Sequence, residues 1–79
     1  MDFIYSRHAR RQMLERRVTE EEINYVLHRY SLTYPADKGG TSLFAELPDG
    51  RKLVVWLANS RPLNKPFFIK SVARRDRHV

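Results

Sequence analysis

The 79-residue sequence predicts one α+β domain over residues 1–79, with two N-terminal helices packed on a twisted, three- to four-stranded antiparallel sheet. Two observations lead to this prediction. Up to about residue 30, apolar residues recur every three or four positions, as in an amphipathic helix. From residue 41 onward they alternate or run continuously between turn signals, as in strands. Helices followed by a series of strands indicate a two-layer arrangement.

The first helix is expected to begin at Ser6, whose side chain can accept a hydrogen bond from a free N–H of the first turn. Ala9 and Met13 lie four positions apart and can form the buried stripe of this helix, which Val18 would close. The apolar residues 3–5 before it fit either a short first strand or a hydrophobic contact at the helix start.

The second helix is expected over about residues 19–29. Thr19 followed by Glu22 has the spacing of a capping box, in which both residues bond each other through side chain and backbone. The apolar positions that follow have helical spacing: Ile23, Val26, Leu27 and Tyr30. Pro35 ends any continuation of the helix.

Three strand segments follow the helices. In residues 41–47 the apolar residues Leu43, Ala45 and Leu47 alternate with Ser42, Phe44 and Glu46, as in a half-buried strand. A Pro-Asp-Gly turn follows at residues 48–50. Residues 53–57 form a continuous apolar run, typical of a strand covered on both faces. Residues 59–66 read as a loop and residues 67–73 as a further strand.

The composition excludes several classes of protein. No apolar run approaches the roughly 20 residues needed to cross a bilayer, and no signal peptide pattern is present at the N-terminus. The absence of cysteine excludes disulfides and thiolate metal sites. Three His without a helical pair or matching carboxylates argue against a metal site. We therefore expect a cytoplasmic protein with no membrane segment, metal or cofactor.

The charge is divided unevenly along the chain, whose formal net charge is +6. Residues 1–18 carry five Arg against two acids, residues 19–50 two cations against six acids, and residues 51–79 eight cations against one acid. Two basic segments around an acidic one predict a positive face, which would attract RNA or an acidic protein. Eleven of the 15 cations are Arg, which suits bidentate phosphate contacts. The alternative is an ordinary solvated basic surface.

The two predicted helices carry a pattern that resembles the opening of a small bacterial family, domain of unknown function 4258. The matching residues are Ser6, His8, Ala9, Met13, Arg16, Val18, Thr19, Glu21, Glu22 and Ile23. That family is similar to the RelE/ParE and BrnT toxins, whose fold is two helices on a twisted antiparallel sheet. The resemblance implies a RelE/BrnT-like fold, a toxin of the ribonuclease type and an acidic antitoxin as partner.

Two positions depart from the family pattern. Gln12 stands where the family often has Arg, and Arg17 stands where it often has Gly. The first departure argues against carrying a catalytic role over to residue 12.

Metal-independent RNA cleavage needs a base for the 2′-hydroxyl, cations for the developing negative charge and an acid for the leaving oxygen. His8 is the candidate base or acid, because an imidazole exchanges protons near neutral pH. The candidate catalytic cations, which would contact the phosphate, are Arg16, Lys70 and Arg74. The candidate RNA-binding residues are Arg7, Arg11, Arg51, Lys52, Arg75 and His78.

Each of these assignments has a structural alternative. His8 could be a structural residue bonded to a neighbour near the helix start, and Lys70 could be an ordinary surface residue. Arg16 could instead pair with Glu20 or Glu21. Trp56 is expected in the core and not as a platform for stacking bases.

The sequence therefore predicts a toxin-type endoribonuclease or RNA-binding protein. The alternative is a non-catalytic basic module that binds nucleic acid or an acidic protein. A DNA-binding helix-turn-helix is excluded, because the second helix would place Glu20, Glu21 and Glu22 against the DNA.

Overall fold

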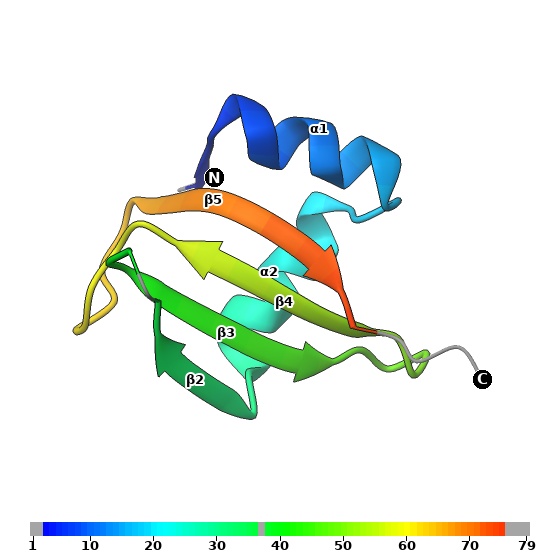
Figure 1. Ribbon diagram of the computed structural model, residues 1–79. Coiled ribbons are helices and arrows are strands. Elements are labelled where there is room, and N and C mark those ends of the chain that lie inside the picture. Colours follow the sequence, from blue (N-terminus) through cyan, green and yellow to red (C-terminus); the bar gives the residue numbers. More distant parts are fainter. Residues whose placement is uncertain (1–2, 37, 76–79) are drawn as a thin grey trace.

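The computed structural model describes residues 3–36 and 38–75, which form two helices and a five-stranded sheet (Figure 1). In chain order the elements are β1 (Phe3–Tyr5), α1 (Arg7–Glu15), α2 (Glu20–Arg29), β2 (Leu32–Pro35), β3 (Thr41–Glu46), β4 (Lys52–Leu57) and β5 (Phe67–Arg74). Neither helix of this part of the chain has the length and apolar character needed to cross a membrane.

The strands are ordered β1-β5-β4-β3-β2, so the first strand in the sequence pairs with the last. β1 runs parallel to β5, with Phe3 opposite Phe67, whereas the other neighbouring strands are antiparallel. The predicted antiparallel sheet of three to four strands is therefore wrong, because the sheet has five strands and is mixed. The α+β class is correct.

Two strands account for this difference. β1 has only three residues, and no local pattern reveals a partner at the other end of the chain. β2 follows closely after α2 and ends at Pro35, which pairs with Thr41 at the edge of the sheet. Proline is tolerated on edge strands, so the signal interpreted as a break marks the end of a strand.

Both helices begin as predicted. Ser6 Oγ accepts a hydrogen bond from the Ala9 N–H at 2.9 Å. At α2, Thr19 Oγ1 accepts from the Glu22 N–H at 3.1 Å, and Glu22 Oε1 accepts from the Thr19 N–H at 2.9 Å. This completes the capping box and satisfies N–H groups that the helix leaves free.

α1 ends in a Schellman motif that has Arg17 at the position usually occupied by glycine. The Val18 N–H donates to the Met13 carbonyl at 2.9 Å, and the Arg17 N–H donates to the Leu14 carbonyl at 3.4 Å. Arg17 has a φ of 54°, in the left-handed region, and is the one non-glycine residue of the described chain with a positive φ. Its Cβ makes this conformation unfavourable by roughly 1 kcal/mol compared with glycine.

The core lies between the helices and one face of the sheet. α2 packs against β3 and β4, and α1 lies along β5 (Figure 1). The largest fully buried side chains are Ile23, Val26, Leu43, Leu53, Val55, Leu57, Ile69 and Val72. Buried residues occupy alternate positions on β3 (Thr41, Leu43 and Ala45), and the largest ones do so on β4 (Leu53, Val55 and Leu57), as expected when one face of a sheet is covered.

Neither helix covers the opposite face of the sheet, which we call the open face. Its residues on β2, β3 and β4 are Leu32, Tyr34, Ser42, Phe44, Glu46, Lys52, Val54 and Trp56. The strand β5 continues this surface toward α1 (Figure 1).

Side chains of α1 and its N-cap complete the hydrogen bonding of β5 where β1 ends. Ser6 Oγ donates to the Lys70 carbonyl at 2.8 Å. Gln12 Oε1 accepts from the Val72 N–H at 2.8 Å and from Ser71 Oγ at 2.9 Å. The side chain of Gln12 is therefore buried and structural, and α1 covers an edge of β5 that would otherwise be free.

Candidate functional site

A groove of about 380 Å³ crosses the open face. Its lining residues are Leu32, Tyr34, Ser42, Phe44, Val54, Trp56 and Arg75, of which three are aromatic and none is acidic. The register of the strands brings them together, because Ser42 lies between Tyr34 and Trp56 on the neighbouring strands. The small Ser42 side chain leaves a depression between two large aromatic ones.

Trp56 is the only tryptophan in the chain and forms part of this groove. The guanidinium carbon of Arg75 lies 5.7 Å from the centre of its ring, within the range of a cation–π contact. The Arg75 N–H donates to the Lys52 carbonyl at 2.8 Å, which holds this residue against the sheet. The expectation that Trp56 belongs to the core is therefore wrong, since β4 has only one face covered by a helix.

Exposed apolar side chains extend to both edges of the open face. On β2, Leu32 is 48% exposed and Tyr34 is 55% exposed. On the opposite edge Ile4 pairs with Phe68, and both point away from the core because their neighbours Phe3, Tyr5 and Phe67 pack against it. Apolar surface that gathers on one face of a small domain indicates a binding surface.

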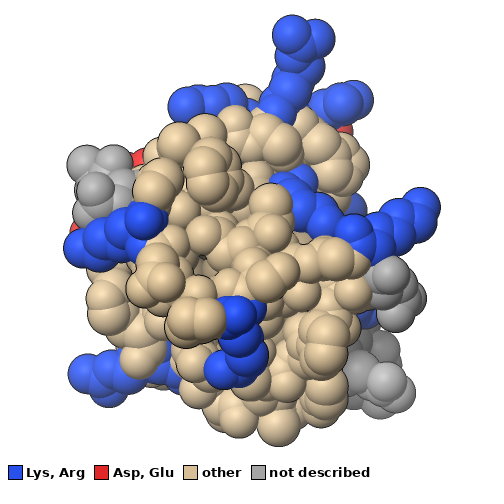
Figure 2. All heavy atoms as spheres, turned by 90° about the vertical axis from the view of Figure 1, so that its left-hand side faces the viewer, with Lys and Arg blue, Asp and Glu red and all other residues tan. Residues whose placement is uncertain are grey.

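Basic side chains surround this apolar surface. Lys70 Nζ donates to the Gly39 carbonyl at 3.3 Å, so this lysine reaches toward the β2–β3 connection. Lys52 lies on the open face at the start of β4, whereas Arg74 pairs in register with the core residue Leu53 and therefore lies on the helix side of the sheet. Figure 2 shows another side of the molecule, the one at the left of Figure 1, at one end of the sheet; there too Lys and Arg project around a largely uncharged surface and little Asp or Glu is visible.

A second hollow, of about 200 Å³, lies on α1. We call it the α1 hollow, and its lining residues are His8, Arg11, Gln12, Glu15 and Arg16. It brings together three predicted site residues, His8, Arg11 and Arg16, because they repeat at the helical period. The predicted partners Lys70 and Arg74 lie on β5 and are not among the lining residues.

Arg16 and His8 differ in exposure within this hollow. The Nη1 atom of Arg16 is buried and has no hydrogen-bond partner among the described residues. The predicted alternative, an ion pair of Arg16 with Glu20 or Glu21, is not found among the described residues. Glu20 Oε2 instead accepts from the Tyr5 hydroxyl at 2.8 Å. His8 is exposed in the first turn of α1 and is accessible to a ligand.

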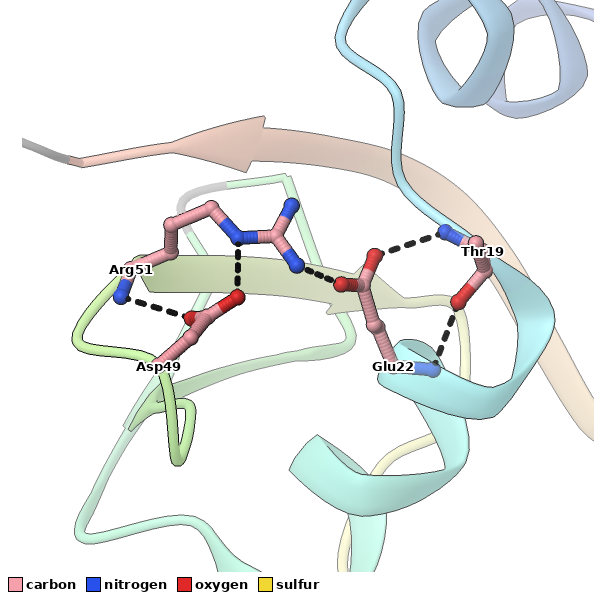
Figure 3. A network of polar contacts seen from close by, with 4 residues as sticks. All are labelled: Thr19, Glu22, Asp49 and Arg51. Atoms are coloured by element: carbon pink, nitrogen blue, oxygen red, sulfur yellow. Dashed lines mark hydrogen bonds and ion pairs between the residues drawn. The ribbon is translucent and has the colours of Figure 1, made fainter.

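Arg51, one of the predicted RNA-binding residues, is held by two carboxylates (Figure 3). Its Nε lies 2.9 Å from Asp49 Oδ2, and its Nη2 pairs with Glu22 Oε2. Glu22 also caps α2, so this network joins the β3–β4 turn to the start of that helix. We assign Arg51 a structural role, because the two carboxylates neutralise its charge.

The remaining predicted residues are placed as follows. Arg7 is exposed at the start of α1, and His78 lies outside the described residues. Within residues 3–36 and 38–75, no three His, Asp or Glu side chains gather into a group that could hold a metal ion.

The chain belongs to the family described as domain of unknown function DUF4258, whose profile matches residues 5–74. Comparisons with curated proteins and with solved structures gave no match. Membership in the family assigns no activity, so the function has to be inferred from the two sites above.

Proposed function

We propose that this domain binds single-stranded RNA across the open face of its sheet. The observation that carries the proposal is the groove in which Trp56 lies beneath Arg75, beside Tyr34 and Phe44. Sheets that recognise RNA present aromatic rings on which unpaired bases stack, together with cations that contact the backbone. The groove has this combination of side chains.

The energetics favour a nucleic acid over an uncharged ligand. Stacking of a base on an aromatic side chain contributes about 1–3 kcal/mol, and each phosphate contact adds a salt-dependent term. The net charge of +6 would draw a polyanion to the domain before any specific contact forms. Lys70 on β5 and Lys52 on β4 flank the path that a strand would follow.

RNA binding can be measured through Trp56, whose fluorescence reports on the groove directly because the chain has no other tryptophan. Stacking should quench this fluorescence on addition of a single-stranded RNA oligonucleotide. Arg75→Gln should weaken binding and reduce the slope of log K against log salt by about one. Double-stranded RNA, whose bases are already stacked, should bind more weakly.

Arg29→Gln is a matched control for Arg75→Gln. Both arginines lie over an aromatic ring, Arg29 at 5.9 Å from the centre of Tyr25, but Arg29 is on α2, away from the groove. Both variants lose one positive charge. Equal weakening by the two would mean that only net charge matters, and the groove would no longer be supported as the site.

Cleavage of the bound RNA is the more specific form of this proposal, and it rests on the resemblance to toxin-type ribonucleases. His8 would take the proton of the 2′-hydroxyl while that oxygen attacks phosphorus and the bond to the 5′-oxygen breaks, and a solvent water would protonate the departing 5′-oxygen. Arg11 and Arg16, which line the same hollow, would stabilise the charge on the phosphate oxygens. No metal takes part in this scheme.

Induced expression in bacteria separates cleavage from binding. Growth arrest with new RNA ends, lost in His8→Ala and retained in His28→Ala, would support a nuclease centred on His8. His28 is a suitable control because it is exposed on α2, where its Nδ1 lies 2.8 Å from the Asn24 carbonyl. Intact RNA in cells that contain folded protein would leave the domain as a binding module.

An acidic protein, such as an antitoxin, is the second candidate ligand of the open face. It is favoured by the aliphatic part of the groove, Leu32 and Val54, which offers nothing specific to a nucleotide. The edge strand β2 beside it could pair with an extended segment of a partner. Binding of an acidic, leucine-containing peptide that displaces RNA and quenches Trp56 would support shared use of this face.

A further inference from the structure

Arg16, one of the residues that line the α1 hollow, has a buried donor without an acceptor. The Nη1 atom of Arg16 is shielded from solvent, and no oxygen of the described residues accepts its hydrogen bonds. An unpaired buried donor is unfavourable by about 1–3 kcal/mol, and by more when the group is charged. Native structures pair such groups almost without exception, so an acceptor beyond the described residues, such as a water or an anion, is expected here.

The frame around this donor is fixed by the backbone and by β5. The Arg16 N–H closes the last turn of α1 by donating to the Gln12 carbonyl at 2.8 Å. One turn earlier, the Gln12 side chain is bonded to Val72 and Ser71. The hollow is therefore part of the folded domain and does not need to be assembled by a ligand.

The charges of the lining residues favour a small anion. Arg11 and Arg16 contribute two guanidinium groups, and His8 adds a ring nitrogen that can donate a hydrogen bond. Guanidinium groups match the geometry of phosphate oxygens, which they bind through paired hydrogen bonds. Glu15 is the one carboxylate in the lining, and it opposes an anion.

We propose that the α1 hollow binds a phosphate group, with Arg16 Nη1 as its buried donor, Arg11 as its second cation and His8 at its open side. The site lies on α1, apart from the groove that holds Trp56, so this inference does not depend on RNA binding on the open face. It deepens the cleavage scheme above, which requires a phosphate to bind at these residues, but phosphate binding here can be tested without any cleavage. A free phosphate and the phosphate of an RNA strand offer the same oxygens to these groups.

Inorganic phosphate is the first probe. Amide and Arg Nε–H NMR signals are followed in ¹⁵N-labelled protein while sodium phosphate replaces sodium chloride at constant ionic strength. We expect saturable shifts confined to α1, with a Kd on the order of 1 mM for so small a ligand. Shifts of equal size in chloride, or shifts spread over all the basic residues, would overturn the proposal.

Charge-matched variants locate the site. Arg16→Gln should weaken phosphate binding about tenfold, whereas Arg17→Gln, which removes the same charge from the exposed neighbour, should leave it within about twofold. Arg11→Gln, on the exposed helix surface, repeats the test if Arg16→Gln folds poorly. Equal effects of Arg16→Gln and Arg17→Gln would overturn the site.

Glu15 provides a test with the opposite sign. Glu15→Gln removes the one opposing charge and should tighten phosphate binding by about threefold, whereas Glu21→Gln on α2 should not. If Glu15→Gln instead abolishes the shifts at Arg16, the carboxylate is the acceptor of this arginine, and the phosphate site is rejected.

Two short RNAs, one with and one without a 5′-phosphate, are then compared in the Trp56→Ala variant. They show whether the phosphate that binds the α1 hollow comes from the end of a strand or from within it. A preference for the phosphorylated strand at the α1 signals indicates a terminal phosphate, and equal binding indicates an internal one. In the protein that retains Trp56, no RNA binding at the groove with phosphate binding intact would overturn the proposed function alone, and the reverse would overturn only the α1 site.

Discussion

Replacement of Gln12 by leucine should destabilise the domain, although the two side chains are similar in size. The Gln12 Oε1 atom accepts two hydrogen bonds from β5, and its side chain is buried. Leucine would leave the buried Val72 N–H without an acceptor, which costs about 1–3 kcal/mol. Loss of the bond from the Ser71 hydroxyl adds about 0.5–1 kcal/mol. We therefore expect a loss of about 2–4 kcal/mol in the free energy of unfolding.

This loss is large for a domain of 79 residues. Domains of this size have a total stability of about 4–12 kcal/mol at about 0.05–0.15 kcal/mol per residue. The melting temperature should fall by roughly 8–32 °C, given about 4–8 °C per kcal/mol for domains this small. Urea titration followed by circular dichroism measures the change in free energy, and hydrogen exchange measures the protection of the Val72 amide.

Ser71→Ala is the matched control, because it removes one of the two donors and leaves the bond to the Val72 N–H intact. It should cost about 1 kcal/mol and leave exchange at Val72 slow. The double variant should be no less stable than Gln12→Leu alone, because that substitution already breaks the Ser71 bond. If Gln12→Leu lowers the free energy of unfolding no more than Ser71→Ala does, or if the Val72 amide stays protected, the hydrogen bonds of Gln12 do not stabilise the contact between α1 and β5 as argued.

Three further predictions concern the backbone and one tyrosine. Arg17→Gly should raise the stability by about 0.5–1 kcal/mol in urea titration, whereas Arg17→Ala should not, because only glycine relieves the positive φ of 54°. Gly40→Ala should lower the melting temperature much more than Gly39→Ala: both have a positive φ, but only at Gly40 would the new Cβ collide with the Leu57 carbonyl. Equal effects would exclude the collision as the cause. Burial and the bond to Glu20 raise the pKa of the Tyr5 hydroxyl above its ordinary value of 10.0. The neutral phenol is therefore favoured in the folded state. Its contribution to the free energy of unfolding is complete below pH 10.0 and is lost as the pH rises from that value through the raised pKa. Tyr5→Phe should flatten the fall in stability at alkaline pH, and an unchanged pH dependence would contradict this assignment.

The helices could be predicted from local sequence because their signals are local. Ser6 and the pair Thr19 and Glu22 lie within one turn of the N–H groups that they cap. The mixed sheet could not be predicted in the same way, because the pairing of β1 with β5 joins opposite ends of the chain. A strand of three residues carries too little pattern to reveal a distant partner.

The sequence pattern of β4 did not reveal the open face, and the reason is physical. A continuous apolar run such as that of β4 arises either when both faces are covered or when one face lines an apolar groove. The alternation on β3 indicated that one face of the sheet is exposed, since Ser42, Phe44 and Glu46 share a face and a strand covered on both faces would not carry Ser and Glu there. The position of Trp56 on the open face follows from its pairing with Ser42 once the register of the strands is known.

The candidate site was predictable only where one helix supplies its residues. His8, Arg11 and Arg16 recur with the helical period, so their gathering in the α1 hollow could be predicted from spacing. The placement of Lys70 and Arg74 relative to that hollow depends on how β5 packs. The neutralised charge of Arg51 depends on the contact between a turn and α2.

The pairing of β1 with β5 has a consequence for folding during synthesis. The segment Phe3–Tyr5 is translated early, but the strand Phe67–Arg74 that completes its pairing leaves the ribosome late. At about 5–20 residues per second the interval between them is about 3–12 s. Until β5 has emerged, the nascent chain has neither the strand that Gln12 binds nor the full groove. The edge of α1 and the Arg75 side of the groove are therefore completed only at this late stage.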